Sequence, residues 1–215
     1  MAMRVILTNS LLKYYLLIKR RITNKLARNN KYKEINKVAK GTVLMREEKV
    51  KIIPLGGLGE IGKNITVFEC DDEIIVVDCG IAFPDEEMYG VDLIIPDISY
   101  LKNNVKKIKG IFLTHGHEDH IGSLPYVLKE VNVPIYGTKL TIGIVKTKLE
   151  EHNLLSEVKL HNVEAGDIIK FDKFKVEFIR NTHSIADSCS LAIFTPVGTI
   201  LHTGDFKIDY TPIDG

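Results

Sequence analysis

The residues most able to do chemistry in this chain lie in the run Leu113-Thr-His-Gly-His-Glu-Asp-His-Ile-Gly122. Neutral imidazole and carboxylate are the usual ligands of zinc and similar divalent cations, and one stretch of six residues holds His115, His117, Asp119 and His120. Four such groups cannot all bind one tetrahedral ion that keeps an open position. The spacing therefore predicts two half-sites, with the first two histidines on one metal and the following Asp–His pair on a neighbour. Two cations roughly 3.5–4 Å apart are a recurring device for hydrolysing phosphate esters and amides.

The elements around this run are suited to position it. The apolar residues Ile111, Phe112 and Leu113 precede the first histidine, and a helix-like segment from Ser123 to Val131 follows the run. The order predicts a strand, then a turn that bears the ligands, then a helix. Rigid scaffolds present functional groups at such strand-to-loop junctions.

The spacing His-x-His-x-Asp-His, which His115 to His120 match in full, is the signature of the metallo-β-lactamase superfamily, and Gly122 follows two residues later. The flanking segments narrow the match, and the chain from about residue 45 to residue 215 resembles the bacterial ribonuclease J family of the β-CASP branch. The segments that carry this resemblance are Pro54-Leu-Gly-Gly-Leu-Gly-Glu-Ile-Gly-Lys-Asn64, Asn181-Thr-His-Ser-Ile-Ala-Asp-Ser188 and His202-Thr-Gly-Asp-Phe-Lys207.

The resemblance implies three further site residues. His183 would join the two histidines of the first metal, and Asp205 would bridge both metals. Asp78, at the end of the apolar run that begins at Ile74, would orient the ligands without touching the metal. The sequence supports the first two independently, because each follows a strand-like segment, Phe174 to Ile179 and Gly198 to Leu201.

The resemblance also implies a function. We expect a metal-dependent ribonuclease that hydrolyses RNA phosphodiester bonds as a 5′-to-3′ exonuclease, with endonuclease action as well, in rRNA and mRNA maturation and decay. Two divalent metals, Zn²⁺ before Mn²⁺ or Mg²⁺, would serve as cofactors because imidazole-rich ligation favours zinc. Asp119 and His120 would act in catalysis through a water held by the metals. The full-length enzyme would form a homo-oligomer or a hetero-oligomer with a paralogue.

Other functions share the metal motif. One alternative is a small-molecule metallo-hydrolase of the thioesterase or lactonase type, and the glycine-rich segment from Gly56 to Gly62 argues against it. Another is an RNA-binding paralogue that has lost catalysis, against which the intact ligand set argues. A third is a truncated product with no function.

Composition bounds the architecture. A chain of 215 residues with 45% hydrophobic content is one domain, or a domain plus an appendage, with a sizeable core. Residues 1–44 hold 11 Lys/Arg and one acid, whereas residues 45–215 hold 18 Lys/Arg and 27 acids. The acidic body does not itself indicate RNA binding, so that expectation depends on the resemblance.

Three cysteines without a Cys-x-x-Cys pair indicate a reducing compartment, and we expect a cytoplasmic protein. Cys189 is expected to be a small buried residue rather than a ligand.

The basic leader, residues 1–44, lies outside the resemblance. Its apolar run from Leu11 to Ile18 is too short to span a bilayer and contains Lys13, so no membrane association is predicted. An organellar transit peptide and a basic arm that touches RNA or membrane are alternatives. We favour an untranslated or disordered leader, because the family-like sequence begins at Met45, directly before the first predicted strand.

The element pattern predicts an α/β fold, the metallo-β-lactamase αββα sandwich, with the metals at one rim. The predicted helices are 99–108, 123–131 and 139–155. The predicted strands are 50–53, 65–70, 73–77, 111–113, 134–136, 158–162, 167–171, 174–179, 190–194 and 199–201.

The same resemblance predicts that the sandwich is incomplete. We expect residues 45–215 to be the N-terminal part of the metallo-β-lactamase domain, with the end of the second half, the β-CASP domain and the C-terminal domain absent. A histidine that the family supplies to the second metal would also be absent. The first metal would then keep four ligands and the second only Asp119, His120 and Asp205, so the first site is expected to bind zinc more tightly.

The glycine-rich stretch from Gly56 to Gly62 has two interpretations. A phosphate-binding loop is one, but the stretch has no Lys-Ser/Thr ending like that of a P-loop. A tight loop between two strands at the rim of the site is favoured. Asn64, just after the loop, would then be able to lean on the metal ligands.

Overall fold

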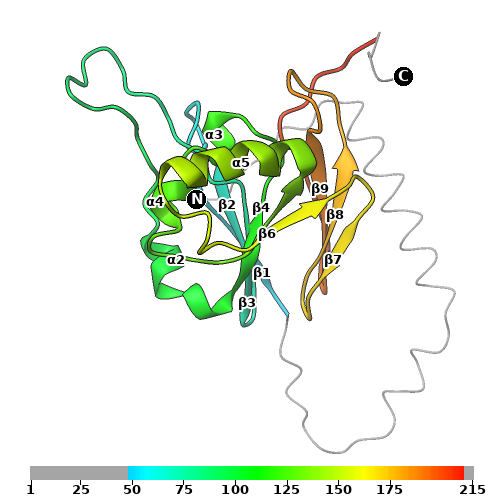
Figure 1. Cartoon of the computed structure of the whole chain (residues 1–215). Helices are drawn as coiled ribbons and strands as arrows, with labels where there is room; N and C mark the ends of the chain where they lie inside the picture. The colour runs from blue at the N-terminus through cyan, green and yellow to red at the C-terminus, as the bar shows by residue number, and fades with distance from the viewer. Residues whose placement is uncertain (1–47, 211–215) are drawn as a thin grey trace, which may run out of the picture. The chain divides into compact units, whose positions relative to one another are not determined.

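The structure is a computed structural model that describes residues 48–210. The described part contains a six-stranded sheet of order β1-β2-β3-β4-β5-β6 and a four-stranded sheet of order β10-β9-β8-β7 (Figure 1). The larger sheet consists of β1 (Val50–Gly56), β2 (Ile65–Cys70), β3 (Glu73–Val77), β4 (Ile108–Phe112), β5 (Ile135–Thr138) and β6 (Leu160–Val163). The smaller sheet consists of β7 (Ile168–Lys170), β8 (Lys175–Arg180), β9 (Cys189–Thr195) and β10 (Gly198–His202).

The centre of the larger sheet is buried on both faces. Every residue of β3 is buried, and the strand pairs in parallel with β4, as β4 does with β5 and β5 with β6. Continuous apolar runs are typical of such strands, because helices cover one face and a second layer covers the other. The parallel strands end at the same edge of the sheet. The segment from Leu113 to Gly122, called the ligand run below, begins there after β4.

Two apolar clusters hold the layers together. Residues from one face of the larger sheet, such as Phe68 and Phe112, pack against Phe174, Phe178 and Leu191 of the smaller sheet. The opposite face of the larger sheet packs against the helices, through side chains that include Leu101, Leu124, Ile142, Val145 and Leu149. The described part therefore has three layers, helix, sheet and sheet, in agreement with the predicted sandwich.

The helices are α2 (Ser99–Asn103), α3 (Glu118–Ile121), α4 (Leu124–Val127) and α5 (Lys139–Glu151), with a short 3-10 helix at Val105–Lys107. The prediction of one helix over 123–131 was wrong in extent, since α4 is a single turn that follows α3. Pro125 has no backbone N–H, so it cannot donate to Ile121 and continue α3 into α4. The predicted helix over 99–108 is shorter as well, because β4 already begins at Ile108.

Helix α5 ends four residues earlier than the periodicity predicted. Asn153 takes a left-handed conformation with φ of 58°, and its N–H donates to the carbonyl of Glu150 at 3.0 Å. The N–H of Leu154 donates to the carbonyl of Leu149 at 2.8 Å. This pair of bonds is the Schellman arrangement that commonly terminates helices.

The remaining predictions about the chain have mixed outcomes. All ten predicted strands are present, with ends shifted by a few residues. In the described range, no helix is long and apolar enough to cross a membrane. The leader, residues 1–44, lies outside the described residues, and the predicted domain limits stay predictions.

Candidate metal centre

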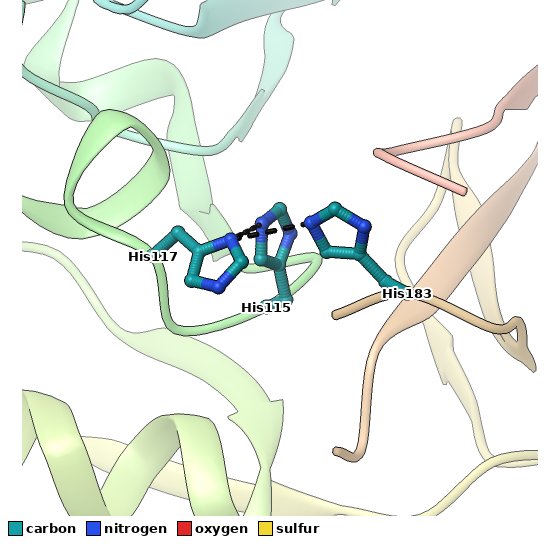
Figure 2. A group of neighbouring side chains, drawn as sticks. All are labelled: His115, His117 and His183. Carbon is teal, nitrogen blue, oxygen red and sulfur yellow. Dashed lines mark hydrogen bonds between the residues drawn. The ribbon is translucent and has the colours of Figure 1, made fainter. Parts of the chain in front are cut away.

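Three histidine rings converge beyond the end of β4. The Nδ1 atom of His117 lies 3.0 Å from Nε2 of His115 and 3.2 Å from Nε2 of His183 (Figure 2). The first two rings come from the ligand run and the third from the loop that follows β8. A set of nitrogens within 4.8 Å of one another is the arrangement in which imidazoles share one cation. The structure thus brings together the three histidines predicted for the first metal.

A second group of candidate ligands lies directly beside the first. The Nε2 atom of His120 is 3.4 Å from a carboxylate oxygen of Asp119 and 3.5 Å from one of Asp205. The same Asp205 oxygen, Oδ2, lies 3.9 Å from Nε2 of His183. Asp205 therefore faces both groups, as a carboxylate that bridges two cations would.

Backbone hydrogen bonds from distant segments hold the turn that carries Asp119 and His120. A four-residue helix such as α3 leaves its last carbonyls without partners inside the helix. The carbonyl of Glu118 accepts from Ile81 at 3.2 Å, and that of His120 accepts from Cys79 at 2.7 Å. The carbonyl of Asp119 accepts from Asn64 at 3.1 Å. The segments after β1 and β3 thus complete α3.

Close packing keeps the segment after β3 against α3. A Cβ built on Gly80 would lie 1.6 Å from the carbonyl oxygen of Asp119. Such an approach is possible only for glycine. Gly80 therefore allows the strand end and the ligand turn to touch backbone to backbone.

Asp78 lies behind the ligands, as the resemblance implied. Its side chain is 1% exposed and accepts hydrogen bonds from Nδ1 of His120 at 2.8 Å and from the backbone N–H of Thr114 at 2.8 Å. Burial alone would raise the pKa of Asp78, but the adjacent His120 and the bond from Thr114 hold it below its usual range. The carboxylate is thus ionised, and it directs the other nitrogen of His120 toward Asp119 and Asp205. Hydrogen-bonded carboxylates of this kind orient metal-binding histidines in proteins.

Thr114 was not predicted, although it lies inside the ligand run. Its hydroxyl contacts both oxygens of Asp78, at 2.9 and 3.1 Å, and Nδ1 of His115 at 3.0 Å. Because an ionised carboxylate only accepts, the hydroxyl donates to Asp78 and accepts from His115. The lone pair of His115 then lies on Nε2, the atom that faces the other rings. A threonine directly before the first ligand histidine is the signal that would have found this role.

The charge states of the histidines differ with their surroundings. Burial and the neighbouring charge of His120 lower the pKa of His115 to about 4, so this ring is neutral and able to bind a metal. Burial would also lower the pKa of His120, but Asp78 and Asp119 overcome it and raise the value to about 10. Burial also lowers the pKa of His183. Cys189 is a buried residue, as expected, and its backbone N–H donates to the carbonyl of Thr114. Burial raises the pKa of its thiol to about 11, which does not favour the thiolate that a metal would bind.

The glycine-rich stretch is a tight loop between β1 and β2, which was the favoured interpretation. The side chain of Asn64, just after it, reaches the second group of side chains. Gly57, Gly59 and Gly62 have positive φ values between 72° and 88°, which let the chain turn between β1 and β2. The side-chain N–H₂ of Asn64 donates to a carboxylate oxygen of Asp119 at 3.3 Å and lies 3.2 Å from Nε2 of His120. The loop thus contributes a side chain to the second group, beside a cavity of about 170 Å³.

Comparison with known sequences places this geometry in a family. The profile of the metallo-beta-lactamase superfamily matches residues 58–213. The chain is 55% identical over 168 residues to the ribonuclease J of Synechocystis sp., covering 77% of this chain and 26% of that protein. It is 54% identical over 176 residues to the ribonuclease J of Thermus thermophilus, covering 79% and 31%. It is 46% identical over 164 residues to ribonuclease J 2 of Staphylococcus aureus, covering 76% and 29%.

Solved structures share the fold at lower sequence identity. A protein of unknown function from Enterococcus faecalis superposes with a TM-score of 0.58 at 20% identity, covering 74% of this chain and 44% of that one. The metallo-beta-lactamase fold protein YhfI from Bacillus subtilis gives a TM-score of 0.53 at 20% identity, covering 75% and 64%. The predicted fold and the resemblance to ribonuclease J are confirmed, and this chain spans between 26% and 31% of the length of the ribonucleases compared.

Proposed function

Because the chain belongs to the metallo-β-lactamase superfamily, we propose that it carries the metal centre of a ribonuclease J that hydrolyses RNA phosphodiester bonds. The relatives that match three quarters of this chain are ribonucleases J, which favours RNA over the small substrates of a thioesterase or lactonase. The proposal includes 5′-to-3′ exonuclease and endonuclease action in rRNA and mRNA maturation and decay, as the resemblance implies. A cytoplasmic location and an oligomeric full-length enzyme belong to the same proposal.

One observation carries the proposal, namely the position of Asp205 between two groups of ligands. The first group is His115, His117 and His183, and the second is His120 with Asp119. A carboxylate oxygen of Asp205 lies 3.5 Å from the second group and 3.9 Å from the first. Two adjacent cations bridged by a carboxylate are suited to an in-line displacement at phosphorus.

The donors fit two divalent cations, and imidazole-rich ligation favours zinc, with manganese or magnesium as alternatives. The ring nitrogens of His115 and His120 that face away from the centre are engaged by Thr114 and Asp78, so the nitrogens that face inward are the ones that would bind cations. His115 is already neutral, whereas His120 would release a proton when a cation binds. Cations held there would lower the pKa of a water and offset charge on the phosphate oxygens.

The side chains have distinct proposed tasks. Asp119 and His120 would hold the second cation and act on the substrate through it, while Asp78 fixes the orientation of His120 from behind. Asn64 brings the amide N–H₂ of its side chain to the edge of the same group. An amide at this position can donate a hydrogen bond to a phosphate oxygen, and donors of this kind stabilise charge as it develops.

Cleavage of a labelled RNA with a 5′-monophosphate tests the proposal. We expect mononucleotide release with zinc or manganese by the parent chain, and none by His117→Ala. His161→Ala, which changes an exposed histidine of β6 outside both ligand groups, is the matched control. Equal activity of His117→Ala and the parent would refute the assignment, whereas an inactive parent that still binds zinc would support the inactive paralogue.

A zinc titration of the same proteins separates the two sites. The first group offers three nitrogens, whereas the second combines one nitrogen with carboxylates, so we expect two affinities with the tighter one lost in His117→Ala. Two equal affinities in the parent would contradict this.

A further inference from the structure

Helix α5 contacts both of the loops that supply the three histidines. We infer that α5 sets the distance between these loops, with Lys148 and Asp187 as positioning residues for the metal centre. The inference rests on the proposed metal centre, since it concerns how the ligands are held. Three separate contacts carry it.

The first contact joins α5 to the ligand run. The ammonium group of Lys148 lies 2.8 and 2.9 Å from the two carboxylate oxygens of Glu118. Glu118 stands between the ligands His117 and Asp119 in sequence, so fixing its side chain fixes the turn on which both depend. The side chain of Lys148 is 19% exposed, and water therefore screens the pair less than it would an exposed one.

The second contact joins the first turn of α5 to the His183 loop. A carboxylate oxygen of Asp187 accepts from the backbone N–H of Leu140 at 3.4 Å, and its carbonyl accepts from the hydroxyl of Thr138 at 2.9 Å. The first N–H groups of a helix lack partners within it, and a negative charge is favourable there. Asp187 has a left-handed φ of 59°, which aspartate tolerates better than most residues. Helix α5 thereby anchors a residue four positions after His183.

The third contact fills the space between the two loops. A Cβ built on Gly116 would lie 2.7 Å from Cδ1 of Ile144 on α5 and 3.5 Å from Cδ1 of Ile185. Gly116 separates His115 from His117, and Ile185 follows His183 by two residues. The Ile144 side chain thus packs where the loops meet, and both loops take their position from one rigid helix.

Zinc affinity, measured in the whole chain, tests the inference without reference to RNA cleavage. Lys148→Met keeps the length of the side chain and removes its charge, and Lys146→Met does the same at an exposed position of α5. Asp187→Gly suits the positive φ and removes the carboxylate. Asn153→Gly also places glycine at a positive φ, at the other end of α5, but removes no charge. Loss of outer hydrogen-bond partners weakens metal binding about tenfold or more, so we expect about a tenfold loss in each test variant and none in its control.

Further measurements distinguish positioning from a general loss of structure. The zinc-free unfolding midpoint of each test variant should match that of its control, and Lys148→Arg and Asp187→Asn should restore zinc binding. The two test substitutions together should weaken binding roughly a hundredfold, because they act on different loops. If test and control variants bind zinc equally, the inference is wrong although the metal centre stands. If the parent chain binds no zinc, both the inference and the proposed function fail.

Discussion

The ligand run after β4 and the two later ligand loops differ in how firmly the fold encloses them. In the run, His115 is fully buried and His120 is 2% exposed. In the later loops, the side chain of His183 is 17% exposed and that of Asp205 is 48% exposed. His115 and His120 therefore belong to the core and Asp205 lies at the surface, with Asp119 of the run, 30% exposed, between these extremes.

Sheet position explains this difference. The run follows β4, which lies between β3 and β5 in the larger sheet, and the backbone segments after β1 and β3 close over it. Asp205 follows β10, which is the edge strand of the smaller sheet in the described part. Substitutions behind the run should therefore destabilise the fold, and substitutions in the later loops should affect metal binding alone.

The largest expected effect is that of Asp78→Ala. It leaves the buried His120 and the N–H of Thr114 without their partner, and alanine is strained at the φ of 61°. Breaking one side of a buried charge pair costs about 3–5 kcal/mol, and we expect a loss of that size in chemical denaturation of the zinc-free protein. Asp72→Ala, at an exposed turn, is the control. A loss of less than about 1 kcal/mol in the free energy of unfolding would show that the hydrogen bonds of Asp78 do not stabilise the ligand run.

Gly80→Ala should come next. Its Cβ would collide with the carbonyl of Asp119, and overpacking of this kind costs about 1–3 kcal/mol. Gly143→Ala is the opposite case, because its Cβ would meet nothing within 4 Å and the position lies inside α5. We expect that change to raise the free energy of unfolding by about 0.5–1 kcal/mol. Denaturation curves that rank the two variants in the reverse order would contradict the close approach of Gly80 and α3.

Glu69→Gln should have a smaller effect, and one that depends on pH. Burial alone would raise the pKa of Glu69, but hydrogen bonds from Lys51, Tyr100 and Lys107 lower it from 4.5 to about 2. A carboxyl with a lowered folded pKa stabilises the protein above its unfolded pKa, and this contribution disappears as the pH falls from about 4.5 toward 2.

We therefore expect Glu69→Gln to lower the free energy of unfolding by about 2 kcal/mol at pH 7. This is less than the full pKa shift would give, because both lysine partners are exposed and water screens their charges. The difference from the parent should shrink steadily below about pH 4.5. Thermal denaturation across this range measures it, with Glu157→Gln as the exposed control. A difference that does not change with pH would show that the ionised form of Glu69 contributes nothing.

The smallest effect on stability is expected for Asp205→Ala. Its side chain is half exposed and the substitution opens no cavity, so the free energy of unfolding should change by less than about 0.5 kcal/mol. Zinc binding should weaken, because the carboxylate faces both ligand groups. Parallel denaturation and zinc titration measure the two quantities. A clear loss of stability in the zinc-free protein would remove the contrast between the two sides of the site.

The sequence was sufficient to predict which side chains gather in the candidate site, because most of them stand in short motifs at the ends of strands; that they bind metal stays a prediction. His115, His117 and His120 lie within one run, and the alternation from Phe174 to Ile179 correctly placed His183 after a strand. The glycine-rich segment was correctly interpreted as a tight loop. The segment Gly198 to Leu201 likewise placed Asp205 after a strand. Its role as the bridging residue came from the resemblance alone, since an aspartate after an exposed edge strand has no distinctive local pattern.

The contacts that hold the motif could not be predicted from local patterns. Gly80 is an ordinary loop glycine in sequence, and only the tertiary fold places it against Asp119. Lys148 occupies one turn of a helix whose charges alternate with apolar residues, and nothing in that pattern indicates a partner 30 residues away. Helix limits were also missed where Pro125 and Asn153 override periodicity.

The three backbone amides that complete α3 belong to Asn64, Cys79 and Ile81, far from the motif in sequence. Their bonds can form only once the chain has been synthesised through residue 120 and the ligand turn has docked. Because the β2–β3 hairpin needs only neighbouring residues, we expect the ligand turn to assemble after it during folding. In the folded protein, slow hydrogen exchange at these three amides would report the opening of the site.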